Sequence, residues 1–134
     1  IQQVNDNDII KYASVTAAAL NVRESHSASS KKASDRDPVI FGAILRIYEI
    51  KDGWYKISKS ASHWVASKYT VDVKRYVVKA TTLNVRSGPS TSFPKVGQIY
   101  KNDQVFIEEN RNNWARIVSE NSWVNMSYLK EFGF

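Results

Sequence analysis

Few residues in this chain have side chains that could carry out catalysis or bind a metal. The 134 residues include no cysteine and only two histidines, His26 and His63. The missing thiols exclude cysteine nucleophiles, disulfides and thiolate zinc sites, and two histidines are too few for a histidine-rich metal site. A serine hydrolase would need a histidine base beside a serine, with an orienting carboxylate. Serines are numerous, but no nucleophile elbow accompanies them, so we expect no enzyme activity, no metal and no cofactor.

Paired carboxylates are a second kind of catalytic site to test. Glu108 and Glu109 are neighbours in a segment that alternates like a strand. Successive side chains of a strand point to opposite faces, so we expect these two carboxylates not to act together. We expect His26 to be a solvated loop residue and His63 to lie in a turn or strand.

The charge and hydropathy of the chain restrict its partners. Its net charge is +6, with 43% hydrophobic and 24% charged residues. The basic residues are spread along both halves rather than gathered in a stripe, which argues against a nucleic-acid groove. The sequence has no apolar run long enough to cross a membrane, so we expect no transmembrane segment.

An internal repeat organises the chain. Leu20-Asn21-Val22-Arg23 recurs 63 residues later, and two further blocks, each containing a tryptophan, recur 60 and 59 residues later. Three blocks in the same order indicate two copies of one unit of about 60 residues. The paired blocks are 20–23 with 83–86, 53–57 with 113–117, and 64–69 with 123–128.

The changes in spacing show where the copies differ in length. Copy one has three more residues than copy two between its arginine and its first tryptophan, and we place them in the polar stretch 24–38. Such a stretch, rich in Ser, Lys and Asp, is typical of a long loop. We therefore expect an N-terminal extension at 1–11, a divergent first domain at 12–72 and a second domain at 73–134.

Within each copy the apolar residues recur with period two. Runs of four to six residues rich in aromatic and β-branched side chains alternate with clusters of Gly, Asn, Asp and Ser. This pattern predicts short antiparallel strands in small barrels, an all-β fold class. By the repeat, 15–20 is expected as strand rather than helix, and 126–129 as a single 3₁₀ turn.

The second copy closely resembles the bacterial SH3 domain, often called SH3b. The resemblance is carried by the run from Leu83 to Pro94, which reads LNVRSGPSTSFP, and by the segments around Trp114 and Trp123. The first copy matches through 20–23, 53–57 and 64–69, but it lacks the Ser-Gly-Pro turn after its arginine and carries the longer loop. Glycines usual before the tryptophans are replaced by Asn113, His63 and Ser122. Asn113 can keep a left-handed turn, whereas His63 and Ser122 do so less readily.

The resemblance implies two tandem SH3-like barrels and a set of groove residues. Trp54 and Trp114 would flank a ligand groove, with Tyr69 and Tyr128 in the closing turn and the loop after the arginine, including Ser90 and Phe93, as the other wall. Aromatic faces beside polar loops suit sugar rings or flat peptide bonds. For both Trp54 and Trp114, ligand contact and a place in the core are about equally well supported by the sequence. We expect Trp64 and Trp123 in the core, and Arg23 and Arg86 bracing the loops.

Two classes of function remain open at this point. The resemblance implies an extracytoplasmic, non-catalytic module that binds peptidoglycan or another cell-wall polymer. The alternative is an envelope protein–protein interaction or assembly domain, or a fragment of a larger cell-wall hydrolase. The divergence of copy one favours the alternative, because a missing turn would suggest a repurposed groove.

Overall fold

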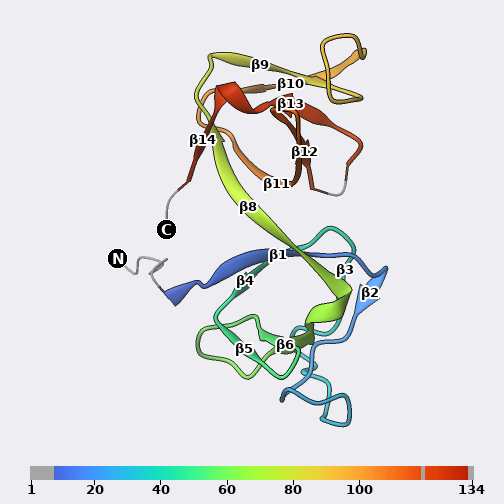
Figure 1. The fold of residues 1–134 in the computed structure, drawn as a ribbon. Coiled ribbons are helices and arrows are strands. Elements are labelled where there is room, and N and C mark those ends of the chain that lie inside the picture. Colours follow the sequence, from blue (N-terminus) through green and yellow to red (C-terminus); the bar gives the residue numbers. More distant parts are fainter. Residues whose placement is uncertain (1–7, 119, 133–134) are drawn as a thin grey trace. The chain divides into compact units, whose positions relative to one another are not determined.

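The fold consists of short strands joined by turns. A computed structural model describes residues 8–118 and 120–132, and its regular elements there are strands and 3₁₀ turns (Figure 1). The all-β fold class expected from the period-two pattern is therefore confirmed. The chain divides between Asp72 and Val73 into two compact units, called here the first and second unit.

The first unit begins within the segment expected to be an extension. Ile9 is buried, the Ile10 N–H donates to the Ile47 carbonyl at 2.7 Å, and Lys11 starts strand β1. Residues 1–7 of that extension lie outside the described residues. The strands of this unit are β1 (Lys11–Val15), β2 (Ala19–Leu20), β3 (Val39–Ile40), β4 (Ile44–Ile47), β5 (Glu49–Lys51), β6 (Trp54–Lys56) and β7 (Trp64–Ala66), followed by the 3₁₀ turn η2 (Ser67–Tyr69).

Antiparallel pairing and alternation build the core of the first unit. β1 pairs with β4, β2 with β3, and β6 with both β5 and β7. In β4, Leu45 and Ile47 are buried while Arg46 between them is exposed, as the period-two pattern predicts. The buried cluster comprises Ala13, Val15, Leu20, Val22, Ala33, Val39, Leu45, Ile47, Tyr55, Ile57 and Val65.

The second unit is a single antiparallel arrangement. Its strand order is β10-β9-β13-β12-β11-β8, with β14 also pairing with β8. β8 (Thr70–Val78) starts in the first unit and ends in the second. The other elements are β9 (Thr82–Arg86), β10 (Lys95–Tyr100), β11 (Gln104–Arg111), β12 (Trp114–Ile117), β13 (Trp123–Asn125), η3 (Met126–Tyr128) and β14 (Leu129–Glu131). The 3₁₀ turn expected at 126–129 is confirmed by η3.

The sequence repeat is also a repeat of backbone hydrogen bonds. In the first unit the Thr16 N–H donates to the Tyr69 carbonyl, and in the second the Lys79 N–H donates to the Tyr128 carbonyl. Three further N–H to carbonyl bonds of the first unit have counterparts in the second. Given as donor and acceptor, they are Val15–Ala43 and Val78–Asp103, Ile57–His63 and Ile117–Ser122, and Ser67–Gly53 and Met126–Asn113. Equivalent positions of the two copies are therefore held by equivalent bonds.

The strand expected at 15–20 is interrupted. β1 ends at Val15 and β2 begins at Ala19, so that part of the prediction is wrong for residues 16–18. The Val15 carbonyl accepts from Gly42 and the Ala18 carbonyl accepts from Phe41, so the chain bends while both ends stay bonded to the β3–β4 turn. Alternation of side chains alone does not reveal such a bend.

The turns before Trp54 and Trp114 have the same geometry. Asp52 and Gly53 have φ values of 50° and 81°, and Asn112 and Asn113 have values of 50° and 68°. Two successive positive φ values are the signature of a tight two-residue hairpin turn, which asparagine tolerates better than most residues. The prediction that Asn113 keeps the left-handed turn is confirmed. Neither His63 nor Ser122 has a positive φ.

The loop after Arg23 forms the same turn as the loop after Arg86, although it has no Ser-Gly-Pro sequence. The Glu24 N–H donates to the Lys31 carbonyl as the Ser87 N–H does to Pro94, and the Ser27 N–H donates to Ser25 as Ser90 does to Gly88. The side-chain bonds also match, because Ser27 Oγ accepts from the Ser29 N–H and Ser90 Oγ accepts from the Ser92 N–H. The expectation that copy one has lost this turn is wrong. Its extra residues lie after Lys31, within 32–38.

Candidate functional site

A pocket in the first unit brings two of the expected ligand residues together. It has a volume of about 380 Å³, and both Trp54 and Tyr69 line it. Antiparallel pairing explains their meeting: Trp54 on β6 lies opposite Ala66 on β7, and η2 follows directly. The other lining residues are Ala17, Ala19, Leu20, Asn21, Arg23, Ala28, Ala66 and Lys68.

The turn that carries Tyr69 is bonded to the hairpin that carries Trp54. Both the N–H and the Oγ of Ser67 donate to the Gly53 carbonyl, each at 2.9 Å. Trp54 is half-buried outside the apolar cluster, and Tyr69 is 43% exposed. An aromatic face that is held in place and still open to solvent is suited to stacking on a ligand.

The corresponding residues of the second unit, Trp114 and Tyr128, occupy equivalent positions. Trp114 on β12 lies opposite Asn125 on β13, and Tyr128 in η3 is 49% exposed. Here the turn is bonded through side chains: Asn113 Nδ2 donates to Asn125 Oδ1 at 3.3 Å and to Ser127 Oγ at 2.8 Å. The two units thus present the same aromatic pair beside different polar groups.

The hydrogen bonds of Ser90 and Phe93 stay within their own loop. Ser90 Oγ is 2.6 Å from Ser92 Oγ, and the Phe93 N–H donates to the Ser90 carbonyl at 3.3 Å. The Phe93 side chain is 41% exposed and lies against Gly88. Their expected role in ligand binding therefore stays a prediction.

The two arginines of the repeated motif brace these loops. The Nη1 atom of Arg23 donates to the Ser30 carbonyl at 2.8 Å, and Nη1 of Arg86 donates to the carbonyls of Thr91 and Phe93 at 3.2 and 3.0 Å. This confirms the expected bracing role. Each guanidinium offers several donors, so one side chain can hold a whole turn.

Trp64 and Trp123 are buried, but they lie outside the apolar clusters. Their neighbours Val65 and Val124 belong to those clusters, and adjacent strand residues point to opposite faces. The Trp64 ring centroid is 5.2 Å from that of His26, in the loop 24–31. The Arg111 guanidinium lies 5.3 Å from the centre of the Trp123 ring. Both tryptophans are among the buried hydrophobic residues of the core, so the expectation is confirmed.

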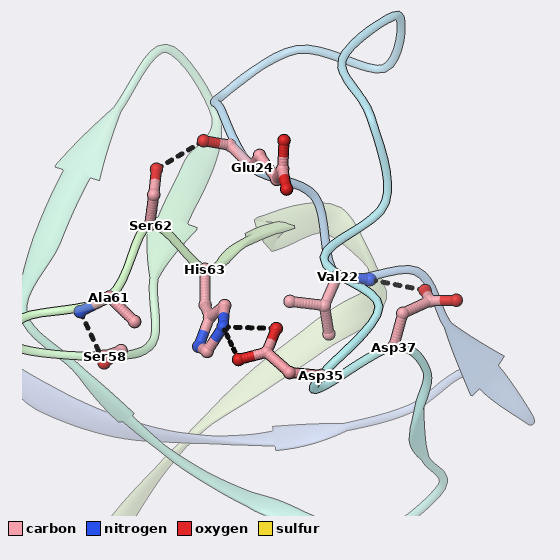
Figure 2. Close-up of polar contacts among 8 residues, drawn as sticks. All are labelled: Val22, Glu24, Asp35, Asp37, Ser58, Ala61, Ser62 and His63. Carbon is pink, nitrogen blue, oxygen red and sulfur yellow. Dashed lines mark hydrogen bonds and ion pairs between the residues drawn. The ribbon is translucent and has the colours of Figure 1, made fainter.

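The side chain of His63 is bonded to Asp35, in the stretch 32–38 (Figure 2). It is 9% exposed, and its Nε2 lies 3.1 Å from both carboxylate oxygens of Asp35. Two serines of the same segment bond to other groups: Ser62 Oγ donates to the Glu24 carbonyl, and Ser58 Oγ accepts from the Ala61 N–H. The added stretch 32–38 is therefore bonded through Asp35 to His63, the residue before β7, and through Asp37 to Val22, whose N–H donates to Asp37 Oδ1 at 2.9 Å.

Glu108 and Glu109 act on the same partner, which overturns the expectation from alternation. The register between β11 and β12 shifts between Ile107 and Glu109. Such a bulge allows neighbouring side chains to lie on one side. Glu108 is 2.7 Å from Nη1 of Arg116 and Glu109 is 3.2 Å from its Nε. Both carboxylates are therefore ion-paired with the Arg116 guanidinium, and Glu109 is also paired with Arg111.

Two lysines and one glutamate have shifted pKa values, all of them away from the pocket. Partial burial pulls the pKa of Lys11 down, but hydrogen bonds with Tyr55 and Asp72 outweigh it and raise the pKa above 10.5. A hydrogen bond to Asp8 raises the pKa of Lys59. The hydrogen bond from Arg111, together with that from Arg116, lowers the pKa of Glu109 below 4.5. Each of these shifts therefore reports on an ion pair, with Asp72 for Lys11, with Asp8 for Lys59, and with Arg111 and Arg116 for Glu109.

Sequence reasoning missed several pocket residues. Lys68 and four alanines line the pocket, yet none of them has a side chain that suggests binding by itself. The repeat could have indicated Lys68, because it lies in the same repeated block, 64–69, as Tyr69. Across residues 8–118 and 120–132, no three acidic or histidine side chains cluster closely enough to hold a metal ion. The same residues include no helix with the length and apolarity that a membrane crossing requires.

Part of this all-β chain is similar to a known family. Residues 81–130 match the family model of the bacterial SH3 domain, which confirms the resemblance seen in the second copy. The search of curated proteins found no match.

Solved structures also resemble the chain. NlpC2 and NlpC1 from Trichomonas vaginalis are each 16% identical with a TM-score of 0.38 over 91% of this chain. The match covers 48% of NlpC2 and 46% of NlpC1, so this chain spans about half the length of either. The CBD of endolysin LysPBC5 is 13% identical, with a TM-score of 0.40 over 96% of this chain and 98% of that one.

Proposed function

We propose that the chain is a non-catalytic binding module of the bacterial cell wall, built of two tandem SH3-like barrels that recognise peptidoglycan. The observation that carries this proposal is the pocket between Trp54 and Tyr69, at the place where the resemblance expects a groove. The bacterial SH3 match over 81–130 supports it from the other copy. An extracytoplasmic location is part of the same proposal.

The chemistry of the pocket fits a polymer of sugars and peptides. Half-exposed aromatic faces stack on flat peptide bonds or sugar rings, and the neighbouring Asn21 can orient them by hydrogen bonds. Trp114 and Tyr128 offer a second site of the same kind. Two weak sites on one chain raise the avidity for a repetitive polymer. The net charge of +6 adds attraction to anionic wall polymers.

Co-sedimentation of the purified chain with peptidoglycan sacculi tests the proposal. We expect binding that survives moderate salt, because specific stacking is less screened than diffuse charge attraction. Trp54→Ala and Trp114→Ala should each weaken it, and the double variant should weaken it most. Phe41→Ala is the matched control, because Phe41 is exposed and does not line the pocket.

The contradicting outcomes are specific. Wild-type retention by a folded Trp54→Ala, Trp114→Ala double variant would remove the grooves from the proposal. Binding that disappears at modest salt would leave only diffuse electrostatics.

One observation favours the alternative, an envelope protein-binding domain. Ile40, the last residue of β3, and Phe41, which follows it, are 63% and 54% exposed. Exposed apolar pairs of this kind are common at protein interfaces. Recovery of a stoichiometric envelope protein by the wild type but not by Phe41→Ala, together with no affinity for sacculi, would support this alternative over the cell wall.

A further inference from the structure

We propose that the pocket of the first unit selects peptides that have small side chains and a free carboxylate. The ammonium group of Lys68 is the positive charge that pairs with this carboxylate. This inference rests on the proposed function and specifies its ligand. It concerns the first unit alone, because the equivalent position of the second unit has no cation.

The charges of the pocket lining are all positive. Arg23 and Lys68 line it, and none of the lining residues is acidic. Nη1 of Arg23 is engaged with the Ser30 carbonyl, so this guanidinium braces the wall. Lys68 is exposed, its Nζ lies 5.1 Å from the centre of the Tyr69 ring, and the structure gives it no acidic partner among the described residues. Its ammonium group is therefore available to a ligand anion next to the aromatic face.

The apolar part of the lining is shaped for small groups. Four alanines, Ala17, Ala19, Ala28 and Ala66, line the pocket together with Leu20. A methyl side chain leaves space while keeping the wall apolar, so a peptide with alanine-sized side chains can approach Trp54. Long side chains would compete with the walls for a volume of about 380 Å³. A short peptide therefore fits this pocket better than a bulky apolar ligand.

The second unit supplies an internal comparison. The repeat keeps the leucine, asparagine, arginine, tryptophan and tyrosine at the equivalent positions. It replaces Lys68 by Ser127 and Ala66 by Asn125, whose side chains are bonded to Asn113. Ala19 and Ala28 are replaced by Thr82 and Thr91. The shared residues account for a common stacking function. The replaced ones give the pocket of the first unit one more cation and a more apolar lining than the equivalent surface of the second unit.

A pair of probe peptides tests the inference directly. N-acetyl-trialanine with a free carboxylate and the same peptide as its C-terminal amide differ only in charge. We would titrate each into the intact chain and follow the indole N–H signals of Trp54 and Trp114 by NMR. The acid should bind at Trp54 about three- to five-fold more tightly than the amide, as expected for one exposed ion pair, and added salt should reduce the difference.

Reciprocal substitutions locate the preference. Lys68→Ser should abolish the acid-over-amide preference at Trp54 while keeping amide binding. Ser127→Lys should create a preference at Trp114. Arg46→Ser is the matched charge control, because Arg46 is exposed on β4 outside the pocket. It should leave the preference unchanged.

Failure of the inference can be told apart from failure of the proposed function. Equal binding of the two peptides, no shift at Trp54 with either peptide, or a preference that persists in Lys68→Ser would each overturn the inference, even if sacculi bind. A preference that follows Lys68 would support it even if sacculi do not bind.

Discussion

The ring of Phe93 lies directly on the backbone of Gly88. A Cβ on residue 88 would lie within 3.0 Å of three atoms of that ring, closer than real Cβ atoms pack. In the equivalent turn of the first unit, Ser25 and Ser30 stand at the positions of Gly88 and Phe93. There the contact is a hydrogen bond, because Ser30 Oγ donates to the Ser25 carbonyl at 3.0 Å. One backbone turn is thus stabilised by an aromatic ring in one copy and by a hydroxyl in the other.

Gly88→Ala should therefore displace the Phe93 ring. We expect a loss of about 1 kcal/mol in the free energy of unfolding, at the low end for overpacking because the half-exposed ring can swing aside. Urea denaturation measures it. The loss should shrink when Phe93→Ala is added, and a double-mutant cycle gives the coupling.

Gly97→Ala is the control for this prediction, since a Cβ there meets no atom within 4 Å. Equal losses from Gly88→Ala with and without Phe93→Ala would show that the ring is not the obstacle.

Asp37→Ala should destabilise the first unit. Asp37 Oδ1 accepts the N–H of Val22, a residue with no exposed surface, so removal leaves a buried donor without a partner. Such a loss amounts to about 1–3 kcal/mol, measurable by urea denaturation. Asp37→Asn keeps an acceptor oxygen and should lose less. If the two variants were equally unstable, charge rather than the hydrogen bond would be responsible.

The stability of the chain should fall in acid through Glu109. Its pKa is lowered below 4.5 in the folded state, so its stabilising contribution is complete above the unfolded pKa and is lost as the pH falls through the folded value. Urea midpoints measured downward from about pH 6 should therefore decline in this range.

Glu109→Gln should reduce stability at neutral pH and flatten the decline, and Glu131→Gln, on the exposed part of β14, serves as control. An unchanged slope in Glu109→Gln would assign the acid sensitivity to other groups.

Arg86→Met should loosen the loop 87–94. The guanidinium holds the carbonyls of Thr91 and Phe93, and methionine retains the length of the stem but not the donors. We expect the amide of Phe93 to exchange roughly three- to ten-fold faster, with little effect on the core amides. Hydrogen exchange by NMR measures this. Protection equal to wild type would mean that the turn holds without the brace.

Much of the fold was predictable from the sequence because it depends on local patterns. The period-two runs gave the strands and their buried faces, as in Leu45 and Ile47. The tolerance of asparagine for positive φ accounted for the turn at Asn113, and the repeat aligned Trp54 with Trp114 and Tyr69 with Tyr128. These signals are carried by neighbouring residues, so a single chain is enough to interpret them.

Less of the candidate site was predictable, because it depends on contacts between distant segments. The pocket joins residues from β2, the loop 24–31, β6 and η2. Its alanines can be recognised as part of a site only in the folded chain, where they line the same pocket as Trp54 and Tyr69. The bulge that turns Glu108 and Glu109 to one arginine arises from strand pairing, which alternation does not encode.

The sequence by itself thus determined the all-β class, the repeat and the bacterial SH3 resemblance, because each is a pattern of residue types along the chain. The tertiary structure alone decided that Glu24 to Lys31 form the same turn as Ser87 to Pro94, because backbone hydrogen bonds can be kept while side chains change. It also decided where the added residues go, because Asp35 and Asp37 find their partners, His63 and Val22, only in the folded chain.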